Sequence, residues 1–445
     1  IGADDALLVQ TFTLNGTTDV DLSATGSDYK RIFRMKNTGT TNLGGHVWVR
    51  TNESAQDVGT PCYIYSQKTF LHHLNVLRDA FTSLDPIICY SIKANSNLAI
   101  CSLLNREGSG FDVVSGGELF RALKVGADPA KIVYAGVGKT RPEIELAINS
   151  GVLLFNVESI NEARAIDAVA QELGKTARIA LRLNPDVDAK THAYTTTGKK
   201  ENKFGMDFDM ARDVVASLGA MPGVELAGFH LHLGSPINTV DPYVEGLEKT
   251  LPFIEEVRSK GVDLRYLNIG GGYGIEYGNN ATVGPADYAA AVGPLIRKSG
   301  CKLIMEPGRV ISGNSGVLVT RVTYMKEAPT KTFAICDAAM NDLIRPALYG
   351  SFHRIWPVDT NLPVDAFDGE SDAEGSVTID VVGPVCESGD FLAKDRKLPK
   401  VAQGDLLAVF SAGAYGMTMS SNYNSRPRVC EVLVDGDAYR IIRER

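Results

Sequence analysis

The middle of the chain alternates short apolar runs with longer stretches of helical periodicity. Eight runs have the length and composition of buried strands: residues 87–92, 111–114, 131–134, 152–156, 178–183, 226–233, 264–269 and 302–305. The early runs are spaced by roughly 20–26 residues, the length of a βα repeat. Residues 159–172, with Ser159 as the N-cap, and residues 243–260 show the helical pattern between strands. This alternation predicts an α/β fold built on a closed (β/α)8 barrel, with a doubly wound open sheet as the alternative.

The pattern changes after residue 325. Residues 377–382, 406–410, 429–434 and 439–442 are rich in β-forming side chains and are separated by turns that contain Gly, Asp and Pro. We therefore expect an N-terminal segment over residues 1–65, a barrel over residues 66–325 and an all-β C-terminal domain over residues 326–445. The first 55 residues are rich in Thr, Asn and Gly and alternate only weakly. They either pack partly with the β-domain or lack fixed structure.

The composition allows a sizeable core, because 44% of the 445 residues are hydrophobic and 22% are charged. The formal net charge is −8, and no basic stripe favours a nucleic-acid partner. The seven cysteines include no CxxC pair, which argues against a disulfide framework or a zinc site and favours a reducing compartment. We see no apolar run of about 18 residues and no leader pattern. We therefore expect no membrane partner and a cytoplasmic location, or the plastid stroma for a plant-type chain.

Candidate catalytic side chains stand at the ends of predicted strands, where barrel active sites are built. Lys93 follows the first strand in the motif YSIKAN. His230 and His232 close the sixth strand, and the two-residue period of a strand places both on one side. A lysine at a strand end can equally be a solvated charge. The histidine pair can equally be packed in the core, or bind a metal as in barrel hydrolases with an HxH motif.

Two later strand ends carry further polar motifs. Gly270, Gly271 and Gly272 follow the seventh strand, and consecutive glycines let backbone N–H groups approach an anion closely. The run does not form a GxGxxG pattern, which disfavours a dinucleotide site. Glu306 and Arg309 follow the eighth strand in the motif EPGR. Glu306 can accept a hydrogen bond from a pyridinium nitrogen, or it can form a salt bridge with Arg309.

The β-rich part of the chain carries two motifs of its own. Residues 386–390, CESGD, place the thiol of Cys386 beside the carboxylate of Glu387. Residues 413–416, GAYG, contain Tyr415. Taken alone, the first is equally a buried cysteine before a turn, and the second a flexible turn with an aromatic residue.

These residue types suit one particular chemistry. Decarboxylation of an amino acid requires stabilisation of negative charge at Cα, which protein side chains do not provide alone but pyridoxal phosphate does. A site for this cofactor needs a lysine for the aldehyde and a carboxylate for the pyridine nitrogen. It also needs donors for the phosphate and a group beside the ring.

The motifs YSIKAN, DVVSGGEL, HLHLGS, GGG, EPGR, CESGD and GAYG follow one another along the chain. In this order they resemble the fold-type III pyridoxal-phosphate-dependent decarboxylases, which include enzymes for ornithine, arginine and diaminopimelate. The resemblance extends from Gly59 to the C-terminus. It implies a barrel of the alanine-racemase type followed by a β-domain, and a homodimer with shared active sites in which β-domain residues reach the partner's barrel.

The resemblance also implies roles for individual residues. Lys93 would form the Schiff base with the cofactor, His232 would stack on its ring and Glu306 would bind its nitrogen. Cys386 would donate the proton that replaces carbon dioxide, and Tyr415 would contact the cofactor and substrate. The remaining cofactor-binding residues, near the phosphate or substrate, would be Ser235, Gly270, Gly271, Gly272, Gly308 and Arg309.

Two regions resemble the members of this family that act on meso-2,6-diaminopimelate in lysine biosynthesis. One comprises residues 183–186, 191–198 and 203–205, and the other is NDLIRPALY at residues 341–349. Arg345, assisted by Arg309 and Tyr349, would bind the distal carboxylate of this substrate, and Glu387 would bind its ammonium group. Ornithine lacks that carboxylate and would leave the guanidinium groups unpaired. Ornithine, arginine or a related diamine precursor remains the alternative substrate.

Two features depart from the family pattern. Residues 1–55 are longer and more polar than expected, and Ala339 stands where the family usually has Gly. A positive φ would strain Ala339, so we expect local adjustment there. The rival functions are a metal-dependent barrel hydrolase, a racemase on the same barrel and a non-catalytic homologue. The presence of Lys93, Glu306 and Cys386 together disfavours the last of these.

Overall fold

The computed structural model describes residues 58–188, 203–278, 281–360, 375–436 and 438–445, and the backbone of three short strands before residue 51. The chain divides into two compact units. Unit 1 comprises Ile1–His73, Ile275–Ala281 and Ile311–Arg445, and unit 2 comprises Leu74–Gly274 and Thr282–Val310. We expected domain boundaries at residues 65/66 and 325/326; the units divide at residues 73/74 and 310/311.

Unit 2 contains a closed barrel whose strands follow the order β10-β11-β12-β5-β6-β7-β8-β9 and pair in parallel. The strands are β5 (Ile87–Ser91), β6 (Gly110–Val113), β7 (Ile132–Tyr134), β8 (Leu154–Val157), β9 (Ala177–Leu183), β10 (Val224–Leu231), β11 (Tyr266–Asn268) and β12 (Lys302–Met305). All eight predicted strands are present. The closed (β/α)8 barrel is therefore confirmed over the open sheet.

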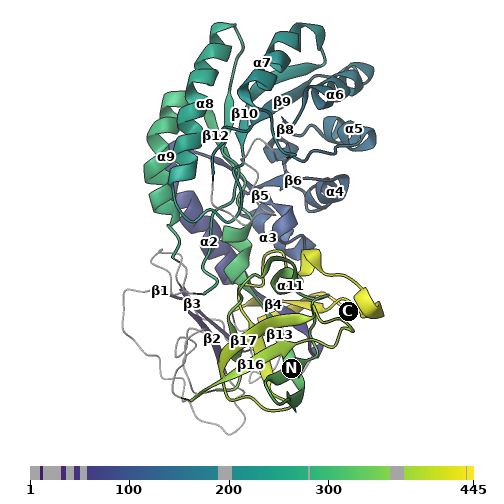
Figure 1. Ribbon diagram of the computed structural model, residues 1–445. Helices are drawn as coiled ribbons and strands as arrows, with labels where there is room; N and C mark the ends of the chain where they lie inside the picture. The colour runs from purple at the N-terminus through teal and green to yellow at the C-terminus, as the bar shows by residue number, and fades with distance from the viewer. Residues whose placement is uncertain are drawn as a thin grey trace. The chain divides into compact units, whose positions relative to one another are not determined.

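Helices lie outside the strands of the barrel (Figure 1). The longer helices are α2 (Gln67–Ala80), α3 (Leu98–Arg106), α4 (Gly116–Lys124), α5 (Arg141–Ser150), α6 (Ile160–Glu172), α7 (Phe208–Ser217), α8 (Asp241–Ser259) and α9 (Pro285–Ser299). Polar side chains fix where helices begin. Ser159 accepts a hydrogen bond from the N–H of Glu162 at the start of α6, as predicted, and Ser115 does the same for Glu118 in α4.

Unit 1 is built, over the part of the chain that the structure describes, on a nine-stranded sheet. Its strands are β4 (Cys62–Ser66), β13 (Gly316–Glu327), β14 (Thr332–Cys336), β15 (Ile355–Pro357), β16 (Ser376–Val382), β17 (Phe391–Pro399), β18 (Leu406–Val409), β19 (Cys430–Asp435) and β20 (Ala438–Arg443). The main path runs β17-β16-β14-β13-β4-β19-β20, while β18 pairs with β13 and β15. Two short helices lie between strands in the sequence. Helix α10 (Arg309–Ser312) comes before β13, and helix α11 (Arg345–Tyr349) lies between β14 and β15.

Strand β4 ties the N-terminal part of the chain to the β-domain. It pairs in parallel with β19 and antiparallel with β13, so it lies between two strands that are distant in sequence. Cys62 and Ile64 of β4 are buried in a hydrophobic cluster with Val317, Trp356 and Val432. Burial of this cluster therefore binds residues 62–66 into the sheet. The strands β1 (Thr11–Thr13), β2 (Ile32–Lys36) and β3 (Gly45–Arg50) form a separate sheet in the order β1-β3-β2.

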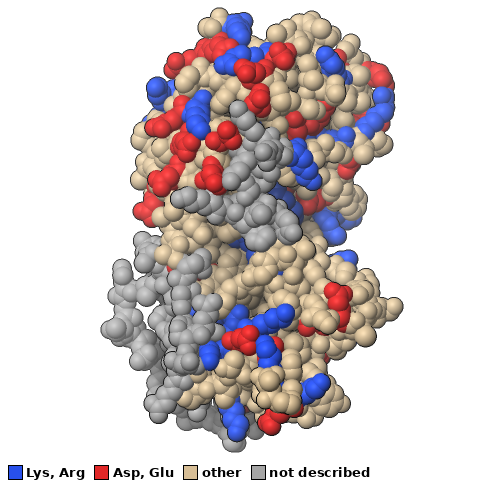
Figure 2. Space-filling view, viewed as in Figure 1, with Lys and Arg blue, Asp and Glu red and all other residues tan. Residues whose placement is uncertain are grey.

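The charged side chains of unit 2 are of mixed sign on the face shown in Figure 2, where acidic and basic residues alternate over short distances. Several of them form exposed ion pairs, such as Arg141 with Glu172 and Lys249 with Glu245. Among the described residues, no helix combines the length and apolar character needed to span a bilayer.

Candidate active site

Lys93 lies at the carboxyl end of β5, in the short 3-10 turn Ile92–Ala94. Its Nζ is 2.5 Å from Oδ2 of Asp112, a residue of β6 whose side chain has no exposed surface. The same carboxylate oxygen accepts a hydrogen bond from Ser91 Oγ at 2.7 Å. Burial raises the pKa of Asp112, and the adjacent Lys93 ammonium opposes that rise. The lysine amine is thus held at a fixed place above the end of the strand.

Glu306 directly follows β12, and three donors converge on its buried carboxylate. Oε1 accepts from Asn156 Nδ2 at 2.8 Å and from Asn268 Nδ2 at 2.6 Å, while Oε2 lies 3.2 Å from His230 Nε2. Burial alone would raise the pKa of Glu306. The hydrogen bond and charge of His230, with the charge of Lys93, outweigh burial and hold this pKa well below its usual range. Glu306 is therefore a carboxylate at neutral pH.

The two histidines of β10 have different environments. Their rings stack with centroids 6.5 Å apart, but His230 points to Glu306 whereas His232 Nδ1 accepts a hydrogen bond from the N–H of Gly271 at 3.3 Å. Burial, followed by the nearby charges of Arg182 and Lys93, lowers the pKa of His232 well below 6.5. His232 is therefore neutral, and its ring presents an uncharged face. Across the described residues, no cluster of His, Cys, Asp and Glu is arranged to hold a metal ion.

The glycine run after β11 permits a very close approach of backbone segments. A Cβ atom on Gly271 would lie 2.0 Å from the carbonyl oxygen of Glu306, and one on Gly272 would lie 2.1 Å from that of Gly234. Gly270 and Gly272 also have φ values of +68° and +101°. Any side chain here would displace the neighbouring strand ends. The run therefore forms a compact backbone cradle at the mouth of the barrel.

Ser235 and Arg309 lie beside this cradle. Arg309 Nε and Nη2 donate to Ser235 Oγ at 3.3 and 3.1 Å, and the guanidinium is buried. Gly308 precedes Arg309 and follows Pro307, whose carbonyl accepts a hydrogen bond from the N–H of Ser91 at 3.0 Å. A buried cation, a hydroxyl and a glycine cradle together suit a phosphate group.

Tyrosine hydroxyls fix the two loops of the cradle. Tyr243 donates to the carbonyl of Gly271 at 2.7 Å, and Tyr288 donates to the carbonyl of Ile237 at 2.6 Å. The N–H of Ile237 donates in turn to the carbonyl of Gly272 at 2.7 Å. These tyrosines could not be predicted from the sequence, because aromatic residues in helices are usually core residues without polar roles.

A buried ion pair supports the strand end that carries His232. Arg182 Nη1 lies 2.7 Å from Glu158 Oε1, and its Nη2 contacts the carbonyl of His232 at 3.4 Å. Glu158 Oε2 accepts from the N–H of Gly205 at 2.6 Å. The pair therefore links the backbone after β8, β9 and β10. Neither Arg182 nor Glu158 was predicted from the sequence to support the site.

Asp112, Asn156 and Asn268 were also missed by sequence analysis. Each is a polar residue within a strand that is otherwise buried and apolar. Such a residue must find a partner inside the barrel, and this was the signal that could have identified it. Within unit 2, the structure thus brings together Lys93 and Glu306 with polar partners to which no role was assigned from the sequence, although Asp112 is the first residue of the motif DVVSGGEL.

Arg345 lies in unit 1, at the start of α11, and is 5% exposed. Its Nη1 donates to Tyr277 Oη at 2.9 Å and lies 3.2 Å from His353 Nε2, and its Nη2 donates to Ser351 Oγ at 3.2 Å. Tyr349 ends the same helix and is half-buried. Contacts with Tyr277, His353 and Ser351 therefore orient the guanidinium.

The CESGD motif forms an exposed turn of unit 1. The N–H of Cys386 donates to Asn424 Oδ1 at 2.9 Å, and Tyr423 Oη donates to Glu387 Oε2 at 3.0 Å. The thiol of Cys386 is exposed, contrary to the alternative of a buried cysteine. Tyr415 adopts a left-handed conformation with φ of +56°. Both motifs therefore lie in irregular segments between strands of unit 1.

The departure at Ala339 has a simple structural outcome. Ala339 does not have a positive φ, and its N–H donates to Asp342 Oδ2 at 2.9 Å. The position that cannot carry a side chain is Gly383, whose Cβ would lie 2.6 Å from Ala339. The backbone at Ala339 is therefore free of the strain that a positive φ would impose. Residues 191–198, which carry part of the resemblance, lie outside the described residues.

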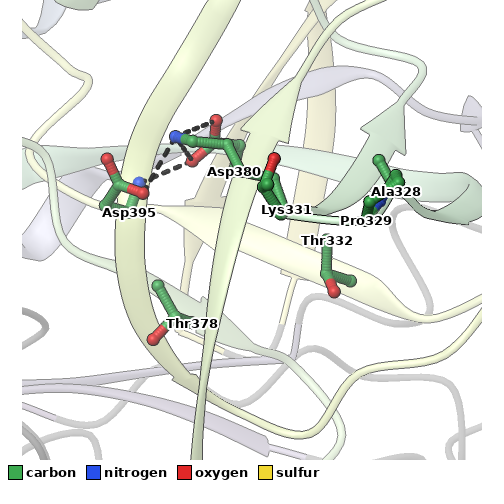
Figure 3. A pocket seen from close by; sticks show the side chains of 8 residues that line it. Ala328, Pro329, Lys331, Thr332, Thr378, Asp380 and Asp395 are labelled. Carbon is green, nitrogen blue, oxygen red and sulfur yellow. Dashed lines mark hydrogen bonds and ion pairs between the residues drawn. The ribbon is translucent and has the colours of Figure 1, made fainter.

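A pocket of about 280 Å³ in unit 1 contains none of the candidate residues (Figure 3). It is lined by the turn between β13 and β14 and by Thr378, Asp380 and Asp395. Lys331 Nζ lies 2.9 Å from each of the two carboxylates, as the dashed lines of Figure 3 mark. An internal cation therefore already balances this acidic pair.

Comparison with known proteins agrees with this site. Residues 68–313 match the family model of the pyridoxal-dependent decarboxylases, pyridoxal binding domain. The diaminopimelate decarboxylase of Aquifex aeolicus is 46% identical over 398 residues, which covers 89% of this chain and 92% of that protein. The corresponding enzyme of Neisseria meningitidis serogroup B is 46% identical over 391 residues, covering 88% and 92%.

A solved structure gives the same result. The crystal structure of diaminopimelate decarboxylase from Helicobacter pylori complexed with L-lysine has a TM-score of 0.82 and 40% identity, and covers 88% of this chain and 95% of that one. By fold and site, the chain is a pyridoxal-dependent decarboxylase. Among these enzymes, it belongs to the diaminopimelate decarboxylase family.

Proposed function

We propose that this chain decarboxylates meso-2,6-diaminopimelate to L-lysine and carbon dioxide, with pyridoxal phosphate as its cofactor. The observation that carries the proposal is the 46% identity to a diaminopimelate decarboxylase over 398 residues, in a chain with Lys93 and Glu306 at adjacent strand ends. This reaction would be the last step of lysine formation.

The residues at the barrel mouth fit the cofactor. Asp112 Oδ1 is buried without a hydrogen-bond partner among the described residues, beside the amine of Lys93, and so can bind an additional donor. The glycine cradle, Ser235 and Arg309 offer donors suited to a phosphate. When bound, pyridoxal phosphate supplies an electron sink for the negative charge left at the substrate Cα.

Each residue then has one defined task. Lys93 binds the cofactor aldehyde through Nζ, in the position fixed by Asp112. Glu306, held ionised, keeps a proton on the pyridine nitrogen through a charge-assisted hydrogen bond. His232, held neutral, packs against the ring without adding a charge that would compete with Glu306.

Recognition of the distal end of the substrate is assigned to four residues. Arg345 binds the distal carboxylate with two parallel hydrogen bonds, Tyr349 and Arg309 assist, and Glu387 binds the distal ammonium group. When ornithine or lysine binds as a substrate, its single carboxylate lies at the reacting Cα, and no carboxylate is left for that distal position. Binding them would leave a buried guanidinium without its anion, which disfavours them strongly.

Cys386 is assigned as the donor of the proton that replaces carbon dioxide at Cα, and Tyr415 as a contact of the cofactor and substrate. We place Cys386 in the site of the partner subunit, so that a homodimer has two shared active sites. The exposure of the Cys386 thiol and its turn supports a role outside its own core. All seven cysteines are free, which supports a location in a reducing compartment such as the cytoplasm or a plastid stroma.

Two experiments test these assignments. Borohydride reduction of the holoenzyme, followed by peptide mapping, is expected to place the cofactor on Lys93; a label on another lysine contradicts that role. Mixing Lys93→Ala and Cys386→Ala chains tests the dimer. If the sites are shared, half of the dimers are mixed and each has one intact site, so roughly a quarter of the activity returns. If each subunit is self-contained, the mixture stays inactive.

A further inference from the structure

The guanidinium of Arg345 has a histidine as one of its partners, and this histidine does not belong to the motifs discussed above. His353 is fully buried, and its Nε2 lies 3.2 Å from Arg345 Nη1. Its other ring nitrogen, Nδ1, lies 2.8 Å from the carbonyl oxygen of Phe410. All three residues belong to unit 1.

These two contacts define the protonation of His353. A carbonyl oxygen can only accept a hydrogen bond, so Nδ1 must carry the hydrogen. A guanidinium can only donate, so Nε2 must present a lone pair to Arg345. Both contacts are satisfied only by the neutral ring with its proton on Nδ1. His353 therefore acts as a hydrogen-bond acceptor for Arg345.

The surroundings of His353 favour that neutral form. Arg345 faces Nε2 of His353. Arg396, in β17, donates a hydrogen bond from Nη1 to the backbone carbonyl of His353 at 2.7 Å. Tyr277 packs edge-on against the imidazole, with ring centroids 5.2 Å apart, and also accepts a hydrogen bond from Arg345. Two permanent cations lie beside the histidine, which opposes a third charge at this place.

We propose that His353 is a positioning residue that sets the plane of the Arg345 guanidinium and thereby the preference for a substrate with a distal carboxylate. A bidentate contact requires the guanidinium plane to match the carboxylate plane. Tyr277 and His353 bind the two hydrogens of Nη1, and so oppose rotation of the guanidinium out of this plane. This proposal rests on the proposed role of Arg345 in substrate binding.

L-Lysine and cadaverine separate this role from catalysis, because they differ by one carboxylate. L-Lysine keeps the distal carboxylate of the substrate, whereas cadaverine lacks it. The experiment measures the inhibition constants of both compounds for the full-length holoenzyme with meso-diaminopimelate as the substrate. The variants are His353→Leu, which removes the acceptor, and His353→Gln, which can supply an acceptor oxygen at a similar distance. Saturation with pyridoxal phosphate, followed by its visible absorbance, shows whether each variant still binds the cofactor.

We expect His353→Leu to raise the inhibition constant of L-lysine by about tenfold and the KM for meso-diaminopimelate by a similar factor. We expect little change in kcat or in the inhibition constant of cadaverine. His353→Gln is expected to recover most of the affinity for L-lysine. His73→Leu is the matched control, because His73 is another buried histidine of unit 1 that contacts the carbonyl of Ile311 and not Arg345. It is expected to leave the ratio of the two inhibition constants unchanged.

Arg345→Ala distinguishes the two proposals. If Arg345→Ala leaves the ratio of the inhibition constants of L-lysine and cadaverine unchanged, the proposed role of Arg345 in substrate binding is wrong. If it abolishes the preference for L-lysine while His353→Leu preserves that preference, only the role of His353 is wrong. An equal loss of L-lysine and cadaverine binding in His353→Leu and His353→Gln also contradicts a positioning role, since that result indicates general damage to the site.

Discussion

The amine of Lys93 and the carboxylate of Asp112 lie 2.5 Å apart at neighbouring strand ends of the barrel. Parallel pairing of β5 and β6 places Ser91 opposite Asp112, so Lys93, two residues beyond Ser91, reaches the carboxylate across the strand ends. Asp112 has no exposed surface, while the lysine side chain is 36% exposed. The amine proposed to bind the cofactor is therefore partly exposed, whereas the carboxylate that holds it is buried.

Asp112→Asn is expected to lower kcat/KM by about 10- to 100-fold, because the amide retains the shape of the carboxylate but not its charge. The rate at which pyridoxal phosphate binds to the apoenzyme should fall as well. Asp85→Asn is the control, since Asp85 pairs with Lys302 on the exposed surface of the same unit. Steady-state kinetics with near wild-type values for Asp112→Asn would contradict the anchoring role.

Gly271→Ala is expected to disrupt the cradle, because its Cβ would overlap the carbonyl oxygen of Glu306. The free energy of unfolding should decrease by about 1–3 kcal/mol, and cofactor affinity should decrease by at least about tenfold. Gly138→Ala has no atom within 4 Å of the added Cβ and no positive φ. That variant should be as stable as the wild type, or slightly more stable. Urea unfolding and cofactor titration measure both effects.

Tyr243→Phe is expected to weaken cofactor binding by roughly 3- to 10-fold, because the buried carbonyl of Gly271 loses its donor. Burial raises the pKa of Tyr243 well above 10, so the hydroxyl keeps its proton and remains a donor. Tyr273 stacks on Tyr243, but its buried hydroxyl has no partner among the described residues. Tyr273→Phe should therefore leave affinity unchanged. Equal effects of the two substitutions would indicate packing rather than the hydrogen bond.

We expect the contribution of Glu118 to the stability of the protein to depend on pH. Burial raises its pKa to about 7, against opposing effects of Lys93 and of the hydrogen bond from the N–H of Val114. Because the pKa of Glu118 is higher in the folded than in the unfolded state, the folded state binds this proton more tightly. The resulting contribution to the free energy of unfolding is fully present below the unfolded pKa of about 4.3. This contribution is lost as the pH rises from there through about 7, because burial disfavours the ionised form.

Glu118→Gln should therefore be more stable than the wild type at pH 8, by an amount on the order of 2 kcal/mol, and the difference should shrink toward pH 4.5. Urea unfolding of the apoenzyme between pH 5 and 8 (roughly the span of the titration) measures it. Glu172→Gln, an exposed residue paired with Arg141, is the control and should show no such gain. A stability difference that does not depend on pH would rule out the titration of Glu118.

The eight barrel strands could be predicted from the sequence because buried parallel strands consist of nearly continuous apolar runs. The strands of unit 1 were harder to identify. The last five residues of β13, from Thr323 onward, are mostly exposed, and β17 contains Lys394, Asp395, Arg396 and Lys397 within one strand. Strand β4 pairs with β19, more than three hundred residues further along the chain. No local pattern indicates such a pairing.

Three residues of the candidate site, Lys93, His232 and Glu306, lie in sequence motifs and could be predicted. Residues that approach them only because the barrel closes were harder to predict. Asn156 is 150 positions before Glu306 in the sequence, yet it donates to the Glu306 carboxylate at 2.8 Å. His353 lies outside any motif, and its role follows only from the contacts of its two ring nitrogens. Sequence periodicity identifies which residues are buried, but not which buried polar groups become partners.

The choice of substrate separates the proposed function from a decarboxylase of ornithine or arginine. The holoenzyme should be incubated separately with meso-diaminopimelate, L-ornithine, L-arginine and L-lysine, while released carbon dioxide and amino-acid products are measured. We expect carbon dioxide and L-lysine in equal amounts from meso-diaminopimelate, little release from the other three, and none from any of them with Lys93→Ala. Release of carbon dioxide from L-ornithine or L-lysine at a rate equal to or above that from meso-diaminopimelate would contradict the assignment of meso-diaminopimelate as the substrate.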